Sequence, residues 1–194
     1  MKLSICGMTA CGKSYLAKKI ARKFNLEYIS GSDFLLKMAG FVPEGDHFWI
    51  NEFGEQLTEE RIRNSEIDRD SDEFILQIAK TKEDTIFDSW TLPWLYEGDD
   101  LYKIYLEANL EARAKIAYGS RERKPYTLSD IKERIRKKDE DSANIFRELY
   151  GIDISDYSFF DLIVDNSELK PGKTYKILLN GIMLKFQHML IHSR

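Results

Sequence analysis

The sequence predicts an α/β fold of three layers (α/β/α), in which a five-stranded parallel sheet lies between helices. Segments typical of strands alternate with segments typical of helices, as in a parallel sheet that is covered on both faces. A glycine-rich segment, GMTACGKS, stands between the first expected strand and the first expected helix. The chain has 194 residues, which is enough for one domain with a substantial core, so we expect a single domain over residues 1–194.

The expected elements follow one another in a regular order. The apolar segment KLSIC predicts the first strand, and SYLAKKIARKF has the apolar spacing of the helix that follows it. Later strands, such as TIFD, are equally short and apolar. The expected strands lie near residues 2–6, 27–30, 85–88, 102–106 and 161–165, and the expected helices near 13–24, 33–40, 58–82, 109–118, 128–150 and 172–191.

Two segments are longer than a minimal alternation of strands and helices requires. The first, about residues 31–84, contains the acidic run SEIDRDSDEF, and the second, about residues 119–141, is crowded with both signs of charge. Excursions of this size from the core of the fold predict a substrate-holding insertion and a lid. Solvated helical faces would give the same patterns.

Residues 7–14 match the pattern G-x-x-x-x-G-K-[ST] at every fixed position, and they stand between a strand and a helix as that motif requires. The expected fold is therefore that of a P-loop NTPase. Glycines let successive backbone N–H groups converge on an anion, and the helix N-terminus adds partial positive charge. Lys13 would reach the β- and γ-phosphates, and the Ser14 hydroxyl would coordinate Mg²⁺. The expected nucleotide-binding residues are Gly7, Met8, Thr9, Ala10, Cys11, Gly12, Lys13 and Ser14.

Polar and aromatic residues follow the second and third expected strands. Asp88 closes the strand TIFD, and its carboxylate could hold Mg²⁺ through water, contact the acceptor substrate or cap the following turn. Ser32 and Asp33 hold the matching place after the second strand, where substrate contact and helix capping are both open. The ring of Trp90 could stack on a nucleobase or form part of the wall. We predict substrate contacts at these four residues and a catalytic role for Asp88.

The expected lid carries several basic side chains. Phosphoryl transfer spreads negative charge over the transferring oxygens, and cations on a closing element stabilise that charge. Arg134 and Lys138 are four residues apart and project from one helical face, so we predict that they act in catalysis together with Lys13. Acidic neighbours such as Glu133 and Asp139 could instead pair with these bases on an ordinary surface.

The composition argues against several classes of protein. The net charge of −4 argues against non-specific nucleic-acid binding. No stretch approaches about 18 apolar residues, so we expect no membrane span. The N-terminus runs directly into a strand, without the profile of a signal peptide, so we place the protein in the cytoplasm. We also expect a monomer. The two cysteines, Cys6 and Cys11, are too few for a disulfide framework or a four-cysteine zinc site. We expect both to have structural roles, with redox control at Cys11 as the alternative.

These segments resemble the cytidylate kinase family of P-loop nucleoside monophosphate kinases, especially its shorter archaeal-type members. The resemblance covers most of the chain and is carried by the phosphate loop, ISGSDF, SEIDRDSDEFILQIAK, LEARAKIA and ELYGIDISDYSFFDLIVDNSEL. It implies ATP as the donor, Mg²⁺ as the cofactor and CMP or dCMP as the acceptor. In addition, it implies that the insertion at about residues 31–84 binds the monophosphate. It also implies that Arg113 lies on the nucleotide side and that Asp165, Asn166 and Ser167 lie near the adenine.

The chain departs from this family at positions that grip the acceptor and the transferring phosphates. Trp90 stands where the family has an arginine after the third strand, and Lys138 and Ile145 stand where its lid helix has an arginine pair. The sequence therefore supports the donor site better than the acceptor. The alternative functions are a P-loop kinase for another small acceptor and an ATP-binding module with reduced or lost transfer.

Overall fold

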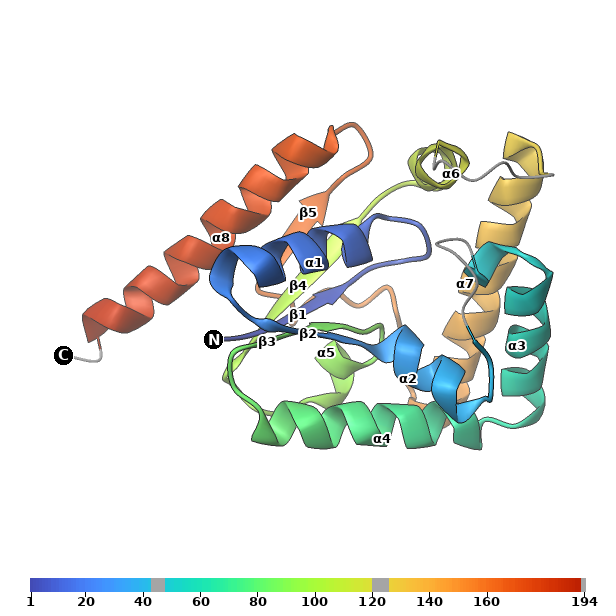
Figure 1. The fold of residues 1–194 in the computed structure, drawn as a ribbon, viewed down its shortest axis with the longest axis horizontal. Helices are drawn as coiled ribbons and strands as arrows, with labels where there is room; N and C mark the ends of the chain where they lie inside the picture. The colour runs from blue at the N-terminus through green and yellow to red at the C-terminus, as the bar shows by residue number, and fades with distance from the viewer. Residues whose placement is uncertain (43–47, 120–125, 193–194) are drawn as a thin grey trace.

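The computed structural model describes residues 1–42, 48–119 and 126–192. Its centre is a sheet of five parallel strands in the order β2-β3-β1-β4-β5 (Figure 1). The strands are β1 (Lys2–Cys6), β2 (Glu27–Ser30), β3 (Thr85–Asp88), β4 (Leu101–Glu107) and β5 (Leu162–Asp165). All five expected strands are present, and their parallel pairing confirms the predicted α/β class.

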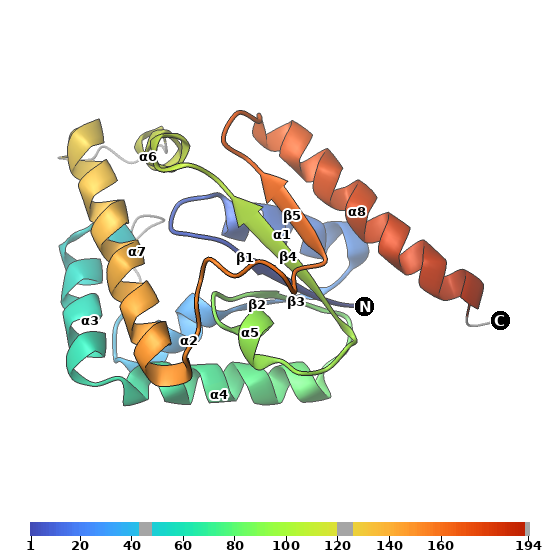
Figure 2. The same cartoon turned by 180° about the vertical axis from the view of Figure 1, so that it is seen from behind.

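The helices fall into three groups by their position around the sheet. They are α1 (Lys13–Phe24), α2 (Gly31–Met38), the 3₁₀ turn η1 (Phe48–Ile50), α3 (Glu52–Arg63), α4 (Glu66–Thr81), α5 (Leu92–Leu95), α6 (Leu110–Tyr118), α7 (Leu128–Tyr150) and α8 (Pro171–His192). Residues of α1 and α8 pack on one face of the sheet, and residues of α4, α5 and α2 pack on the other. The helices α3, α6 and α7 stand beyond the carboxyl ends of the strands (Figures 1 and 2). None of the helices in the described ranges is both long and apolar enough to cross a membrane.

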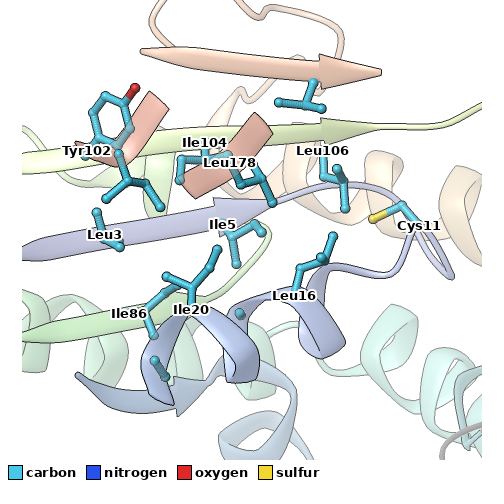
Figure 3. Packing of buried hydrophobic residues seen from close by; sticks show 14 of the residues in the cluster. Leu3, Ile5, Cys11, Leu16, Ile20, Ile86, Tyr102, Ile104, Leu106 and Leu178 are labelled. Carbon is cyan, nitrogen blue, oxygen red and sulfur yellow. The ribbon is translucent and has the colours of Figure 1, made fainter. Parts of the chain in front are cut away.

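The main core lies between the sheet and the layer formed by α1 and α8 (Figure 3). Leu16 and Ile20 of α1 and Leu178 of α8 belong to one cluster with Ile5 and Ile104 of the central strands, and each of these side chains is at most 2 % exposed. Burying apolar surface contributes roughly 25 cal/mol per Å², so this layer stabilises the frame from which the site loops project. The loops after β1, β2 and β3 all emerge at the end of the sheet that faces α7 (Figure 1).

The region after the second strand differs from the prediction. The prediction of a single helix over residues 58–82 is wrong, because α3 ends at Arg63 and α4 begins at Glu66. Asn64 adopts φ −136° and ψ 83°, which are not helical angles, and it redirects the chain. This break allows α3 to pack against α7 while α4 packs under the sheet. The short helix α5, which has Pro93 in its first turn, has no counterpart among the predicted elements.

The expected lid covers two parts of the chain. Residues 120–125 lie outside the described residues. From Leu128 onward the segment is the first half of α7, which starts at a capping box formed by Thr127 and Asp130. Ile131 and Ile135 are buried against α6 and η1. Movement of residues 119–141 therefore stays a prediction, and the α7 part of that range is packed against its neighbours.

Candidate active site

The loop between β1 and α1 has the backbone shape that phosphate binding needs. Gly7, Ala10 and Gly12 have positive φ angles of 153°, 64° and 93°. A Cβ on Gly7 would lie 2.4 Å from the carbonyl oxygen of Leu106, so glycine is required there. The left-handed conformation of Ala10 costs an L-residue about 1–2 kcal/mol, and it persists because surrounding contacts hold the loop.

Three buried side chains hold this loop at two separate points, Thr9 and Cys11. Asp139 of α7 accepts a hydrogen bond from the Thr9 N–H, with N···Oδ1 at 3.1 Å. Arg113 of α6 donates to the Thr9 carbonyl at 3.0 Å and to Oδ2 of Asp139 at 2.5 Å. Asn166, just after β5, donates to the Cys11 carbonyl at 3.0 Å. The protein's own side chains therefore set the conformation of the loop.

Lys13 and Ser14 occupy the first turn of α1. Lys13 is half-buried, with its ammonium 5.8 Å from the ring centroid of Trp90, and Ser14 is exposed. Gly12 caps the helix without a side chain, so no side chain competes with an anion for the N–H groups of the first turn. These features fit a phosphate-binding helix start.

Cys6 and Cys11 are both buried and free. Burial raises the pKa of each thiol above its ordinary value, and it is the largest cause for both. A raised pKa disfavours the reactive thiolate. The structural roles expected for these cysteines therefore fit better than redox control at Cys11.

The ends of β2 and β3 stand beside one another. Asp88 and Ser30 are partners in the strand register, and Asp88 is 5 % exposed. The Tyr28 hydroxyl donates to Oδ2 of Asp88 at 2.9 Å. Ser30 caps α2 by accepting a hydrogen bond from the Asp33 N–H at 3.2 Å, so the capping role belongs to Ser30. Ser32 is half-buried and Asp33 is exposed, and their contacts with substrate stay predictions.

Two tryptophan rings flank Lys138 of α7. Its ammonium lies 4.8 Å from the ring centroid of Trp49 and 5.1 Å from that of Trp90. It also donates to the Ser142 hydroxyl at 2.7 Å. Trp90 thus lies against both Lys138 and Lys13, and the structure brings these three predicted site residues together.

The charge of Lys138 depends on pH in the neutral range. Burial, the largest cause, lowers the pKa of Lys138 to about 7, and the positive charges of Arg61 and Lys13 act in the same direction. A negative charge placed beside Lys138 would favour its protonated form. This lysine is therefore suited to gain its full charge when an anionic ligand binds.

Arg134, the other predicted catalytic residue of the lid, is engaged with α3. Its guanidinium donates to Glu55 at 2.6 Å and lies 4.1 Å from the ring centroid of Tyr126. The two predicted catalytic residues of this helix therefore have separate surroundings, because Lys138 lies at Trp90 and Arg134 lies at Glu55. A catalytic role for Arg134 stays a prediction.

A buried ion pair beside this site was missed by the sequence analysis. Arg61 of α3 is 1 % exposed and donates to both carboxylate oxygens of Asp68 of α4, at 2.7 and 3.0 Å. Its guanidinium carbon lies 6.0 Å from the ring centroid of Trp49 and 5.9 Å from that of Phe146. Asp68 lies in the acidic run that we interpreted as insertion or solvated face. Its partner, Arg61, lies in α3 on the other side of the break at Asn64, so helical spacing could not predict that the two side chains meet.

Arg113, which we expected on the nucleotide side, and the three residues expected near the adenine all form hydrogen bonds within the protein. Arg113 and Asn166 hold the phosphate loop as described above and are 5 % and 6 % exposed. The Ser167 hydroxyl accepts a hydrogen bond from the Asn109 N–H at 2.9 Å, and Asp165 accepts one from the Ser167 N–H at 2.8 Å. Direct contact of these residues with a nucleotide stays a prediction.

The oxygen atoms of Ser14 and Asp88 fit a magnesium ion that is bound together with phosphates. Mg²⁺ in nucleotide sites takes one or two protein oxygens and completes its shell with phosphate oxygens and water. Ser14 is exposed, and Oδ1 of Asp88 accepts no hydrogen bond from the residues that the structure describes. Within residues 1–42, 48–119 and 126–192, no three or more His, Cys, Asp and Glu side chains cluster to hold a metal by themselves.

Comparisons with known proteins bear on this site. The Cytidylate kinase-like family model matches residues 3–168. The cytidylate kinase of Sulfurisphaera tokodaii is 31 % identical over 191 residues, which cover 97 % of this chain and all of that protein. The cytidylate kinase of Sulfolobus acidocaldarius is 30 % identical over 188 residues, with 97 % of each chain covered.

Solved structures share the fold at low identity. Deoxyadenosine kinase from M. mycoides, with bound dATP, has a TM-score of 0.55 and 16 % identity over 94 % of this chain and 99 % of that one. Shikimate kinase from Bacteroides thetaiotaomicron has a TM-score of 0.58 and 14 % identity over 96 % and 98 %. These neighbours agree with the predicted P-loop fold. Because the family match spans most of the sequence and the archaeal relatives align almost end to end, the chain belongs to the Cytidylate kinase-like family.

Proposed function

We propose that the protein transfers the γ-phosphoryl group of ATP to a nucleoside monophosphate, with CMP or dCMP as the preferred acceptor and Mg²⁺ as the cofactor. The phosphate loop carries this proposal, because side chains from α6, α7 and the end of β5 hold its strained backbone in shape. Family membership supports the acceptor, since the relatives from S. tokodaii and S. acidocaldarius are named cytidylate kinases.

On the donor side, the N–H groups at the start of α1 and the Lys13 ammonium would bind the β- and γ-phosphates. Ser14 and Asp88 would hold Mg²⁺, which would neutralise phosphate charge when bound. Tyr28 orients the Asp88 carboxylate through its hydrogen bond to Oδ2. Oδ1 then remains for a water of the metal or for the acceptor.

On the acceptor side, Lys138 would receive the negative charge of the acceptor and of the transferring group. Within the described residues, neither Lys13 nor Lys138 forms a salt bridge with a carboxylate, and both lie against Trp90. The Trp49 and Trp90 rings would exclude water from this space, which strengthens the interaction of the cations with phosphate. Since phosphoryl transfer needs positioning and charge neutralisation more than covalent chemistry, these groups suffice for the proposed reaction.

A kinase for another small acceptor is the second candidate, and Trp90 favours it. This large apolar ring lies next to Lys13, in the place where a second phosphate-binding cation would be useful. Three buried or half-buried arginines, Arg61, Arg113 and Arg134, are each paired with a carboxylate. An acceptor without a phosphate would need fewer cations.

A screen of acceptors with ATP and Mg²⁺, read by direct detection of the phosphorylated product, tests the proposal. We expect CMP or dCMP to be consumed and phosphorylated faster than AMP, GMP or UMP, and EDTA to stop the reaction. Phosphorylation of a nucleoside or sugar, with every nucleoside monophosphate inert, would establish the second candidate instead. ATP binding without any product would point to the binding module.

A further inference from the structure

The Arg113–Asp139 pair joins three parts of the site that are far apart in the sequence. Arg113 belongs to α6, Asp139 belongs to α7, and both bind the Thr9 peptide in the phosphate loop. We propose that Asp139 is a positioning residue for phosphoryl transfer, which fixes α7 against the loop through Arg113 and Thr9 and so places Lys138 beside Trp90 and Lys13. This inference rests on the proposed function.

The pair is buried and its hydrogen bonding is specific. Asp139 is 3 % exposed, and its two oxygens have different partners, because Oδ1 accepts from Thr9 and Oδ2 accepts from Arg113. Arg113 is 5 % exposed and also donates through Nε to the Ala108 carbonyl at 3.0 Å. A buried ion pair is often no more stabilising than apolar residues of the same size. Stability alone therefore gives little reason for two buried charges here. Their hydrogen bonds to both sides of the Thr9 peptide give a direct reason, because they fix the loop.

The position of Asp139 on α7 links the loop to the acceptor side. Ile131, Ile135 and Asp139 are spaced four residues apart, so they lie along one face of the helix, and all three are buried. Lys138 precedes Asp139 and points about 100° away around the helix axis, toward Trp49 and Trp90. In the same turn of α7, Asp139 therefore holds the loop and Lys138 presents a cation to the acceptor side.

The second anchor of the loop allows the two functions to be separated. Asn166 holds the Cys11 carbonyl, immediately before Gly12 and the start of α1, where phosphate would bind. Asp139 holds Thr9, on the side of the loop that faces α7. Loss of the Asp139 anchor should therefore impair transfer more than ATP binding. Loss of the Asn166 anchor should weaken ATP binding itself.

The decisive variant is the double substitution Arg113→Gln with Asp139→Asn. Removing one charge alone would leave the other buried without a partner, whereas the double variant keeps polar groups and leaves no buried charge. We expect kcat to fall about 10- to 100-fold, as expected for lost charge-assisted hydrogen bonds, while the Kd for MgATP changes less than about threefold. Asn166→Ala should have the opposite effect, in which the Kd for MgATP rises more than kcat falls. Glu133→Gln, which breaks an exposed pair with Arg136 on the same helix, should leave both values unchanged.

A measurement on the unsubstituted chain covers the case in which the double variant does not fold. Amide hydrogen exchange by NMR should show that the Thr9 N–H is as protected as the strands of the sheet. A kcat within about twofold of the unsubstituted enzyme in the folded double variant, or fast exchange at Thr9, would overturn the inference. Full activity of Lys13→Ala would instead overturn the proposed function, and the exchange at Thr9 would still report on the anchor.

Discussion

The ammonium group of Lys138 lies 5.1 Å from the ring centroid of Trp90. The protonated form of a lysine gains about 0.5–2 kcal/mol over an indole ring, and no carboxylate offsets its charge there. Arg61 and Arg113 are paired with carboxylates, and Lys138 is not, in the part of the chain that the structure describes. Lys138 is therefore available to an anionic ligand.

Ligand binding should be coupled to proton uptake at Lys138. Burial, together with the positive charges of Arg61 and Lys13, lowers the pKa of Lys138 to about 7, so this amine is largely neutral at pH 8 before a ligand binds. Bound phosphates would raise that pKa, and the complex would take up a proton. The kcat/KM should fall as pH rises above about 7. Calorimetry of ligand binding at pH 8, in buffers of different ionisation enthalpy, would measure the number of protons taken up.

The variant Lys138→Arg separates this effect from other titrations, because arginine stays charged throughout this range. It should bind ligand without proton uptake and lose the decline above pH 7. In the unsubstituted protein, the folded chain releases the Lys138 proton near pH 7 and the unfolded chain releases it near 10.5. This group's contribution to the free energy of unfolding should therefore rise with pH across that window. Unchanged proton uptake in Lys138→Arg would rule out Lys138 as its source.

The buried pair of Arg61 and Asp68 should be important for folding. The substitution Asp68→Asn leaves a guanidinium that is 1 % exposed without a charged partner, and we expect a loss of about 3–5 kcal/mol in the free energy of unfolding. Glu66→Gln is the matched control, because it breaks an exposed pair with Arg69 in the same helix and should change stability by less than about 1 kcal/mol. Urea unfolding measures both. Equal losses of unfolding free energy in Asp68→Asn and Glu66→Gln would show that the buried pair has no special importance for folding.

Restoring the arginines of the family should have different results at Trp90 and Ile145. Ile145 is 5 % exposed and packs in an apolar cluster with Phe146 and Ile152, so Ile145→Arg should lower stability by several kcal/mol without raising activity. Trp90 is half-buried beside Lys13, and Trp90→Arg should increase kcat/KM for CMP about tenfold or more. Steady-state kinetics and thermal unfolding would distinguish these outcomes. A gain in activity from Ile145→Arg would contradict the buried packing of this part of α7.

The parts of the fold that could be predicted from the sequence are those with local causes. Short apolar strands alternating with amphipathic helices gave all five strands in place, and the glycine and lysine spacing located the phosphate loop. The break at Asn64 was missed because polar residues continue through it with helical periodicity. Beyond the break, α3 packs on α7 and α4 packs under the sheet, and local spacing does not show such contacts between distant elements.

The site was predictable where one motif defines it and not where distant elements meet. Arg113 and Asn166 were selected for contact with the nucleotide, which stays a prediction. Their hydrogen bonds to the loop backbone were not expected, because these bonds depend on how α6 and β5 lie beside the loop. Asp139 was considered only as an acid that could pair with the neighbouring bases on an ordinary surface. Its spacing from Ile131 and Ile135 was a usable signal, because a carboxylate on an apolar helical face requires a buried partner.

The rate at which CDP forms from CMP and ATP·Mg²⁺, measured in parallel for the unsubstituted protein and for Lys13→Ala, tests the central claim most directly. We expect the unsubstituted protein to form CDP and Lys13→Ala to be slower by about 100-fold or more, since it loses a cation aimed at the transferring phosphate. Glu133→Gln should match the unsubstituted rate. CDP formation at equal rates with and without the Lys13 side chain, or no CDP from the unsubstituted protein, would contradict the assignment.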